Sequence, residues 1–260
     1  MLRVLILFAL LFELAAAAEE VINLQTRIGV TQSYLLSMPD AGKPNTVAIL
    51  FPGGLGKTDL QREATRAQLD RGNFLVRTRR LLAGTGIATA VVDAPSDQPG
   101  GMEDDFRLGT AHTEDIGKVV ADLKTRFPGL PVFLVGTSRG TISAAAVGAR
   151  LAKEVDGVVL TATLFLATGR RPGLSGFDFA TITAPVLFVH HVNDGCTYTP
   201  YASAKRVGER YALVSVSGGS PPQSKPCEAM SEHGFLGREA QTVDTIAKWM
   251  AKQPYPREIP

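Results

Sequence analysis

Gly136-Thr137-Ser138-Arg139-Gly140 is the stretch of this 260-residue chain that decides its fold. It follows an apolar run at 132–135 and precedes an alanine-rich segment that begins near Thr141. This order predicts a strand, a sharp turn and a helix. In that context G-x-S-x-G indicates a nucleophile elbow, in which a strained turn lifts the hydroxyl of Ser138 clear of the sheet edge. Because the chain has 26 glycines, the interpretation depends on the flanking strand and helix and not on the spacing alone.

A glycine-rich loop follows a second buried strand. The apolar run at 46–51 leads directly into Pro52-Gly53-Gly54-Leu55-Gly56. Glycines let backbone N–H groups approach a developing oxyanion, so we expect Gly54 or Leu55 to supply one donor and Arg139 the second. A phosphate-binding loop is the alternative, but neither G-x-x-x-x-G-K-[ST] nor G-x-G-x-x-G is present.

A serine hydroxyl is a poor nucleophile near neutral pH, so the elbow requires a histidine base and a carboxylate that orients it. The chain has four histidines. His190 and His191 lie in or directly after the apolar run at 186–189. His112 follows the loop at 93–102 and could approach the site, although a role at a helix start explains it equally well. His233 lies in a loop between the last strand-like run and the final amphipathic segment, where an exposed loop histidine is the alternative interpretation.

The elbow, the glycine-rich loop and a downstream acid and histidine make the chain resemble the α/β-hydrolase superfamily from Thr46 to about Met250. The resemblance implies a mostly parallel sheet flanked by helices, with the site at the carboxyl ends of the strands. It also implies the chain order serine, acid, histidine, and hence His233 as the base. Asp194, in the loop after the run at 186–189, is the expected acid. Asp178 is the alternative, because some relatives place their acid one strand earlier.

The hydrophobic pattern independently predicts an α/β fold with a parallel sheet covered by helices on both faces. Two segments have helical spacing, at 116–127 and 243–250, and 21–38 could supply one or two antiparallel edge strands. We expect one domain over 19–260. Six short apolar runs are predicted as strands: 46–51, 89–93, 132–135, 157–161, 186–189 and 212–216.

The first 18 residues are predicted to be a secretory signal peptide and not part of the fold. Arg3 is followed by an apolar run at 4–12 and by small residues at 16–18, and the run is too short to span a membrane. Its removal takes away one basic and one acidic residue, so the net charge stays +2. Because basic and acidic residues nearly balance, the net charge does not indicate binding to nucleic acid or to an anionic membrane. We therefore expect a secreted or periplasmic protein.

Two cysteines, Cys196 and Cys227, are expected to form a disulfide in an oxidising compartment, with two unrelated buried thiols as the alternative. We predict no metal site, because the adjacent His190 and His191 would point to opposite faces of a strand and no third ligand is suggested by spacing. We predict no cofactor. The sequence does not indicate an oligomeric state.

Large lids are usually inserted between the strand after the elbow helix and the acid strand, and here that interval, Ala167 to Pro185, is only 19 residues long, so we expect an open site without a large lid. Arg139, Arg170 and Arg171 could favour an anionic substrate, with Phe177 for apolar contact, although a solvated arginine pair is an equal alternative. The acidic turn at 103–105 is predicted to be a solvated charge cluster. The resulting hypothesis is a secreted serine hydrolase that cleaves a small ester, or less readily an amide, through an acyl-enzyme. The alternatives are a serine peptidase with the same triad and a non-catalytic binding protein on this fold.

Overall fold

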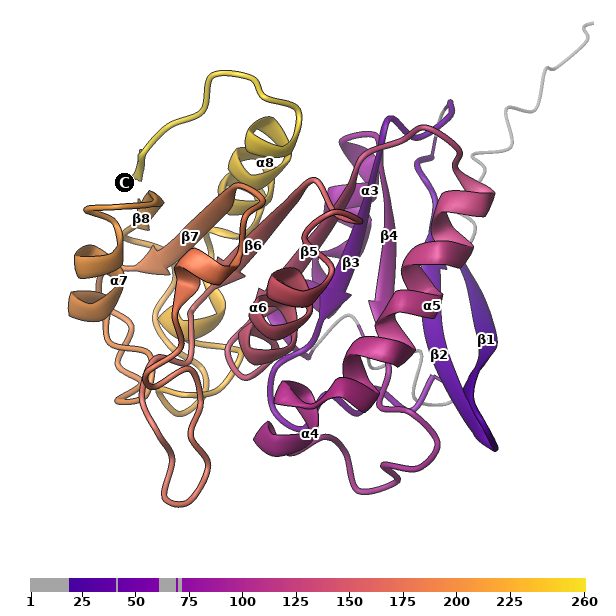
Figure 1. The fold of residues 1–260 in the computed structure, drawn as a ribbon. Helices are drawn as coiled ribbons and strands as arrows, with labels where there is room; N and C mark the ends of the chain where they lie inside the picture. Colours follow the sequence, from indigo (N-terminus) through magenta and orange to yellow (C-terminus); the bar gives the residue numbers. More distant parts are fainter. Residues whose placement is uncertain (1–18, 41, 61–68, 70–71) are drawn as a thin grey trace, which may run out of the picture.

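The computed structural model describes residues 19–40, 42–60, 69 and 72–260. The predicted signal peptide at 1–18 lies outside this described part. One nine-stranded sheet has the order β1-β2-β4-β3-β5-β6-β7-β8-β9 (Figure 1). The strands are β1 (Glu19–Arg27), β2 (Val30–Ser37), β3 (Thr46–Phe51), β4 (Ile87–Val92), β5 (Val132–Thr137), β6 (Gly157–Thr161), β7 (Val186–His191), β8 (Ala212–Val216) and β9 (Glu258–Ile259).

The sheet is mostly parallel, which confirms the predicted fold class. Only the β1–β2 and β2–β4 pairs are antiparallel, and every other neighbouring pair from β4 to β9 is parallel. The predicted edge strands are β1 and β2. Three predicted strands have the bounds expected from the apolar runs, whereas β5 and β7 each extend two residues further. Those extra residues are Gly136, Thr137, His190 and His191, which pair through the backbone although their side chains break the apolar pattern.

Helices cover both faces of this sheet. Figure 1 shows α5 and α6 on one face and α3 and α8 on the other. No helix in the described ranges is long and apolar enough to cross a membrane. The helices are α2 (Phe74–Arg77), α3 (Arg79–Gly84), α4 (Asp104–Leu108), α5 (Thr110–Arg126), α6 (Gly140–Arg150), α7 (Tyr201–Val207) and α8 (Glu239–Met250), with short 3-10 turns η2 (Phe179–Thr181) and η3 (Glu232–Gly234).

Alternating side chains of each strand contribute to two separate cores. In β3, Ile49 packs into the cluster that contains Ile116 of α5, whereas its neighbour Leu50 packs into the cluster that contains Ile246 of α8. All six residues of β3 are buried, as expected for a strand covered on both faces. This packing fixes the central strands, and their carboxyl ends carry the loops that form the candidate site.

Candidate active site

Ser138 follows β5 in the sharp turn that the sequence predicts. Its φ of 53° is in the left-handed region that L-residues seldom adopt. Its N–H donates to the carbonyl oxygen of Thr161 on β6 at 3.0 Å. A Cβ at Gly140 would collide with the carbonyl oxygen of Phe51, and a Cβ at Gly136 would lie 2.5 Å from the Gly140 oxygen. The strand and helix therefore approach as closely as they do only because both flanking residues are glycine.

Asp194 and His233 meet at the carboxyl end of β7. Asp194 lies in the loop after β7, and His233 lies in η3, 39 residues later in the chain. His233 Nδ1 is 3.0 Å from Asp194 Oδ2. Among the residues that the structure describes, the buried Nε2 of the same ring has no hydrogen-bond partner. His233 and Ser138 line the same cavity, whose volume is about 270 Å³.

The carboxylate of Asp194 is held in its ionised form. Its side chain is fully buried, and burial raises the pKa. Hydrogen bonds to the carboxylate outweigh this effect and leave its pKa below the usual range. The hydrogen bond with His233 makes the largest contribution to this lowering. The others come from the N–H of Cys196 at 2.9 Å and the hydroxyl of Thr199 at 2.8 Å. Asp194 is therefore a buried, fully hydrogen-bonded anion beside one ring nitrogen of His233.

Asp178 lies elsewhere. It is exposed, and its side chain accepts a hydrogen bond from the N–H of Ala180 at 3.0 Å, where it caps η2. This turn belongs to the connection that enters β7 at its amino end. Of the two acids considered from the sequence, the structure brings only Asp194 to His233.

The histidines at the end of β7 have structural partners. His191 Nδ1 accepts from the N–H of Asn193 at 3.1 Å, and its Nε2 is 3.0 Å from the carbonyl oxygen of Gly218. His190 is fully buried and accepts from the N–H of Thr163 at 2.8 Å. Burial lowers the pKa of His190 to about 3. These rings join neighbouring loops and leave His233 as the histidine beside Ser138.

His112 is also buried. Its ring lies 6.0 Å from the ring of Phe51 and 5.6 Å from that of Phe106, measured between centroids. Neither ring nitrogen has a hydrogen-bond partner within the described part of the chain, and burial lowers the pKa of His112 to about 3. It is therefore a neutral core residue of α5.

The glycine-rich loop lies against the elbow. A Cβ at Gly53 would lie 3.1 Å from the Cβ of Ser138, so this residue must be small. Gly54 has a φ of 59°, and the N–H of Gly56 closes a turn on the carbonyl oxygen of Gly53 at 3.1 Å. The hydrogen bonds of the described residues do not use the N–H groups of Gly54, Leu55 or Arg139.

A buried arginine anchors this loop through hydrogen bonds. Arg107 of α4 is fully buried, and its guanidinium donates to the carbonyl oxygens of Gly54 at 3.2 Å and Met102 at 3.3 Å. It also donates to Ser143 Oγ on α6 at 2.7 Å. Burial and the charge of Arg139 lower the pKa of Arg107 to about 9, so it stays charged at neutral pH.

The predicted disulfide joins Cys196 to Cys227, with their Cα atoms 4.5 Å apart. It connects the loop that carries Asp194 to the loop that carries His233. Beside it, a Cβ at Gly195 would lie 3.2 Å from Pro226, so the two loops also pack directly.

A second cavity, of about 360 Å³, shares Ser138 with the first and is lined by Arg139 and Arg171. Two of the residues predicted to bind substrate lie outside both cavities. Arg170 is exposed, and Phe177 packs on Phe179 with 5.3 Å between ring centroids.

The acidic turn at 103–105 is only in part the solvated cluster expected from the sequence, because Glu103 and Asp105 are exposed but Asp104 is not. Asp104 accepts from the N–H of Gly173 at 2.9 Å and forms an ion pair with Arg139 at 3.5 Å. Glu103 lies between Arg139 and Arg171. The prediction was wrong for Asp104 because its partners lie 35 and 69 residues further along the chain, where local polarity gives no signal.

Sequence reasoning also missed Thr199 and Asn73. The hydroxyl of Thr199 donates to Asp194 and lies 3.3 Å from His233 Nδ1. Asn73 caps α2 by accepting from the N–H of Leu75 at 3.2 Å, and it lines the cavity that contains Ser138. Asparagine before an apolar segment is a helix-start signal that could have located the cap but not its place beside the serine.

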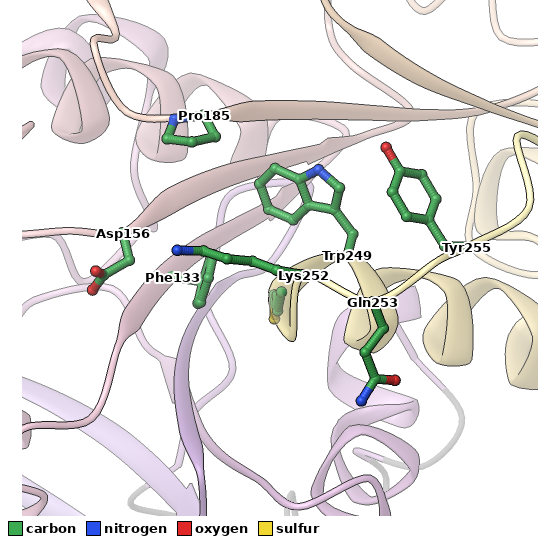
Figure 2. Close-up of a pocket in the computed structure, with 8 residues that line it drawn as sticks. Phe133, Asp156, Pro185, Trp249, Lys252, Gln253 and Tyr255 are labelled. Carbon is green, nitrogen blue, oxygen red and sulfur yellow. The ribbon is translucent and has the colours of Figure 1, made fainter.

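A further cavity, of about 260 Å³, lies at the opposite end of the sheet (Figure 2). Phe133, Asp156 and Pro185 line it, and they stand at or just before the first residues of β5, β6 and β7. Trp249 and Tyr255 complete its aromatic wall, with Trp249 5.8 Å from the ring of Phe133. None of the predicted site residues lies in it, so the candidate site is the carboxyl-end cleft around Ser138.

Comparison with known proteins agrees with the fold. The family model described as "Serine aminopeptidase, S33" matches residues 82–200. A search of curated proteins gives no match.

Solved structures give broader matches. The chain is similar to a cold-adapted esterase from an Arctic intertidal metagenomic library, with 17% identity and a TM-score of 0.59 over 91% of this chain and 95% of that one. It is similar to Est1E from Butyrivibrio proteoclasticus, with 16% identity and a TM-score of 0.61 over 90% and 98%. It is also similar to dienelactone hydrolase from Anabaena variabilis, with 15% identity and a TM-score of 0.62 over 91% and 98%. The chain has the α/β-hydrolase fold, and these matches confirm its resemblance to that superfamily.

Proposed function

We propose that this protein is a secreted serine hydrolase that cleaves small esters through an acyl-enzyme. The observation that carries the proposal is the state of the His233 ring. Its Nδ1 is engaged by the buried carboxylate of Asp194, while its Nε2 has no hydrogen-bond partner among the described residues, and His233 lines the cavity that Ser138 also lines. An ionised carboxylate beside Nδ1 favours the tautomer with the proton on Nδ1, which leaves the Nε2 lone pair as the base.

The residues then act in a defined order. Ser138 Oγ attacks the ester carbonyl carbon while its proton passes to His233 Nε2, and the carbonyl electron pair moves onto oxygen. The free N–H groups of Arg139 with Gly54 or Leu55 stabilise that oxyanion. Its collapse breaks the bond to the alkoxy oxygen, which takes the proton from His233 and leaves as alcohol. Water, deprotonated by the same ring, releases the acid and restores Ser138.

Ester cleavage is preferred over amide cleavage because the structures that resemble this chain include a cold-adapted esterase, a dienelactone hydrolase and a monoglyceride lipase. The family model described as a serine aminopeptidase favours a second candidate, a peptidase that uses the same three residues. A non-catalytic binding protein is disfavoured, since the serine, histidine and acid are all present with an engaged Nδ1 and a free Nε2. Export is supported by the disulfide, which is typical of oxidising compartments.

A fluorophosphonate probe tests this function. Purified mature protein should be labelled at Ser138, and Ser138→Ala should lose hydrolysis by roughly a million-fold while it remains folded. A panel of short-chain esters and aminoacyl anilides then separates the esterase from the peptidase. Labelling of a different serine, or full activity in the alanine variant, would contradict the proposal, and hydrolysis of anilides alone would favour the peptidase.

A further inference from the structure

The cleft around Ser138 has two arms. The histidine arm is the cavity of about 270 Å³ that His233 lines, and the arginine arm is the cavity of about 360 Å³ that Arg139 and Arg171 line. Ser138, Gly54 and Cys227 line both, so the two cavities meet at the serine. A substrate held for attack by Ser138 can therefore place its two halves in different arms.

The proposed chemistry decides which half occupies which arm. His233 must deliver its proton to the leaving alkoxy oxygen, so the alcohol half has to lie on the side of that ring. His233 lines the histidine arm and not the arginine arm. The acyl half is thus directed into the arginine arm.

The two arms differ in charge. The histidine arm contains the carboxylate of Glu228, which disfavours an anionic alcohol half. In the arginine arm, Arg139 and Arg171 adjoin the apolar side chain of Leu164 and the half-buried Tyr198. An acyl half with a short apolar chain and an anionic end would match this lining.

A carboxylate already lies between the two arginines. Arg171 grips Glu103 with two parallel contacts, Nε to Oε2 and Nη2 to Oε1, each 2.6 Å long. Arg139 Nη1 is 3.4 Å from the same Oε2. Both Arg171 and Glu103 keep almost half of their side-chain surface exposed, at 46% and 49%. Because this pair is open to solvent, Glu103 can exchange its contacts with the two arginines for water and leave them to an incoming carboxylate.

The charge balance also permits a second carboxylate. Arg107 is electrostatically coupled to Arg139, Glu103 and Asp104, and it remains charged behind the loop. With Arg171 the cluster has three guanidinium groups, against the two carboxylates of Glu103 and Asp104. When Glu103 moves into solvent, an excess of positive charge remains at the end of the arginine arm.

We propose that the arginine arm binds a carboxylate on the acyl half of the substrate through Arg171 and Arg139, the two lining residues that now pair with Glu103. This inference rests on the proposed ester hydrolysis and names its substrate class: half-esters of short dicarboxylic acids with an uncharged alcohol. Arg171 supplies the bidentate contact, and Arg139 supplies a second guanidinium. Glu103 competes with the substrate for both.

Two isomeric esters test the assignment. Monomethyl glutarate has its carboxylate on the acyl half, and γ-acetoxybutyrate has the same atoms with the carboxylate on the alcohol half. Methyl pentanoate is the neutral reference. We expect kcat/KM to be highest for monomethyl glutarate, lower for methyl pentanoate and lowest for γ-acetoxybutyrate. Arg171→Ala should lower the ratio of kcat/KM for monomethyl glutarate to that for methyl pentanoate about tenfold or more, because both charge-assisted hydrogen bonds of the bidentate contact are lost.

Arg170→Ala is the matched control. It removes the same charge at the position next to Arg171, where the side chain lies outside both arms. It should leave that ratio unchanged. Glu103→Gln distinguishes two roles of Glu103: competition with the substrate carboxylate for the arginines, or a structural clamp that only joins its loop to the loop of Arg171. Competition predicts a lower KM for monomethyl glutarate in this isosteric variant, whereas a clamp predicts an equal loss with all three esters.

The outcomes distinguish failure of the proposed carboxylate site from failure of the proposed ester hydrolysis. Equal rates for the two isomers, faster cleavage of γ-acetoxybutyrate, or a uniform loss in Glu103→Gln would overturn the carboxylate site. If methyl pentanoate is still cleaved and Ser138→Ala abolishes that cleavage, the proposed ester hydrolysis stands without it. If no ester is cleaved and Ser138 is not labelled, the proposed function fails, and this inference fails with it.

Discussion

Arg107 Nη2 donates a hydrogen bond to the carbonyl oxygen of Gly54 across 3.2 Å in the interior of the molecule. The same guanidinium donates to Ser143 Oγ on α6, the helix that follows Ser138. One side chain therefore joins the loop that carries the proposed oxyanion donors to the helix behind the nucleophile. A Cβ at Gly56 would lie 2.5 Å from this guanidinium, which explains why the loop contains a third glycine.

Arg107→Lys should impair the chemical step more than substrate binding. Lysine keeps the charge but cannot reach Gly54, Met102 and Ser143 together. If Gly54 loses its anchor, its N–H is misplaced relative to the oxyanion. We expect kcat to fall about ten- to a hundredfold, less than the loss from removing an oxyanion donor outright, with little change in KM. Steady-state kinetics with a neutral ester measure both constants.

Arg79 provides the matched control. It is also a buried arginine, and it donates to the carbonyl oxygen of Val76 and pairs with Glu19, away from the cleft. Arg79→Lys should lower the midpoint of thermal unfolding while kcat stays near the wild-type value. If the two variants lose stability equally and kcat equally, Arg107 has no positioning role.

Asp194→Asn should lower kcat by about four orders of magnitude, as expected when the orienting carboxylate of a triad is replaced. The amide cannot stabilise the imidazolium that forms when His233 accepts a proton. Asp178→Asn should keep its activity, because that side chain only caps η2. An active Asp194→Asn variant would exclude this acid from the mechanism.

Much of this site could be predicted because its signals are local. The elbow is a five-residue motif whose glycines are required by contacts within the motif and with the neighbouring strand. Asp194 and His233 follow strands that the apolar runs revealed. Since the carboxyl ends of parallel strands meet at one edge of the sheet, chain order was enough to bring these residues together.

The supporting contacts could not be predicted in this way. Glu103 and Arg171 are 68 residues apart, and Arg107 and Gly54 are 53 residues apart. Nothing in the local pattern distinguishes a buried Arg107 from a solvated helix arginine, or a buried Asp104 from a surface acid. Their environment is created only when loops from different strands pack, so it depends on tertiary structure.

Two buried histidines should make stability fall in mild acid. Burial lowers the pKa values of His112 and His190 to about 3, whereas a histidine in the unfolded chain has a pKa of about 6.5. Between these values the unfolded chain binds more protons, so the free energy of unfolding decreases as pH falls through this window. The contribution is fully present above about pH 6.5.

His190→Gln tests this contribution, because glutamine can still accept from the N–H of Thr163 but does not titrate. The slope of the unfolding free energy against pH should decrease by about 1 kcal/mol per pH unit between about pH 5 and pH 6. Urea unfolding at several pH values in that range measures it. A slope equal to that of the wild type would mean that His190 is already protonated in the folded protein.

Loss of the disulfide should reduce both stability and turnover. The bond joins residues that are 31 apart in sequence, and closing a loop of that length stabilises the fold by roughly 3 to 4 kcal/mol in the chain-entropy model. It also restrains the two loops that bring Asp194 to His233, and the N–H of Cys196 itself donates to Asp194. Cys196→Ser/Cys227→Ser should therefore unfold at a lower denaturant concentration, and its kcat should fall by a larger factor than its KM changes.

Mass spectrometry of wild-type protein recovered from an oxidising compartment should find no free thiol. Two free thiols there would contradict the disulfide, while Ser138, Asp194 and His233 would still be tested by their own variants.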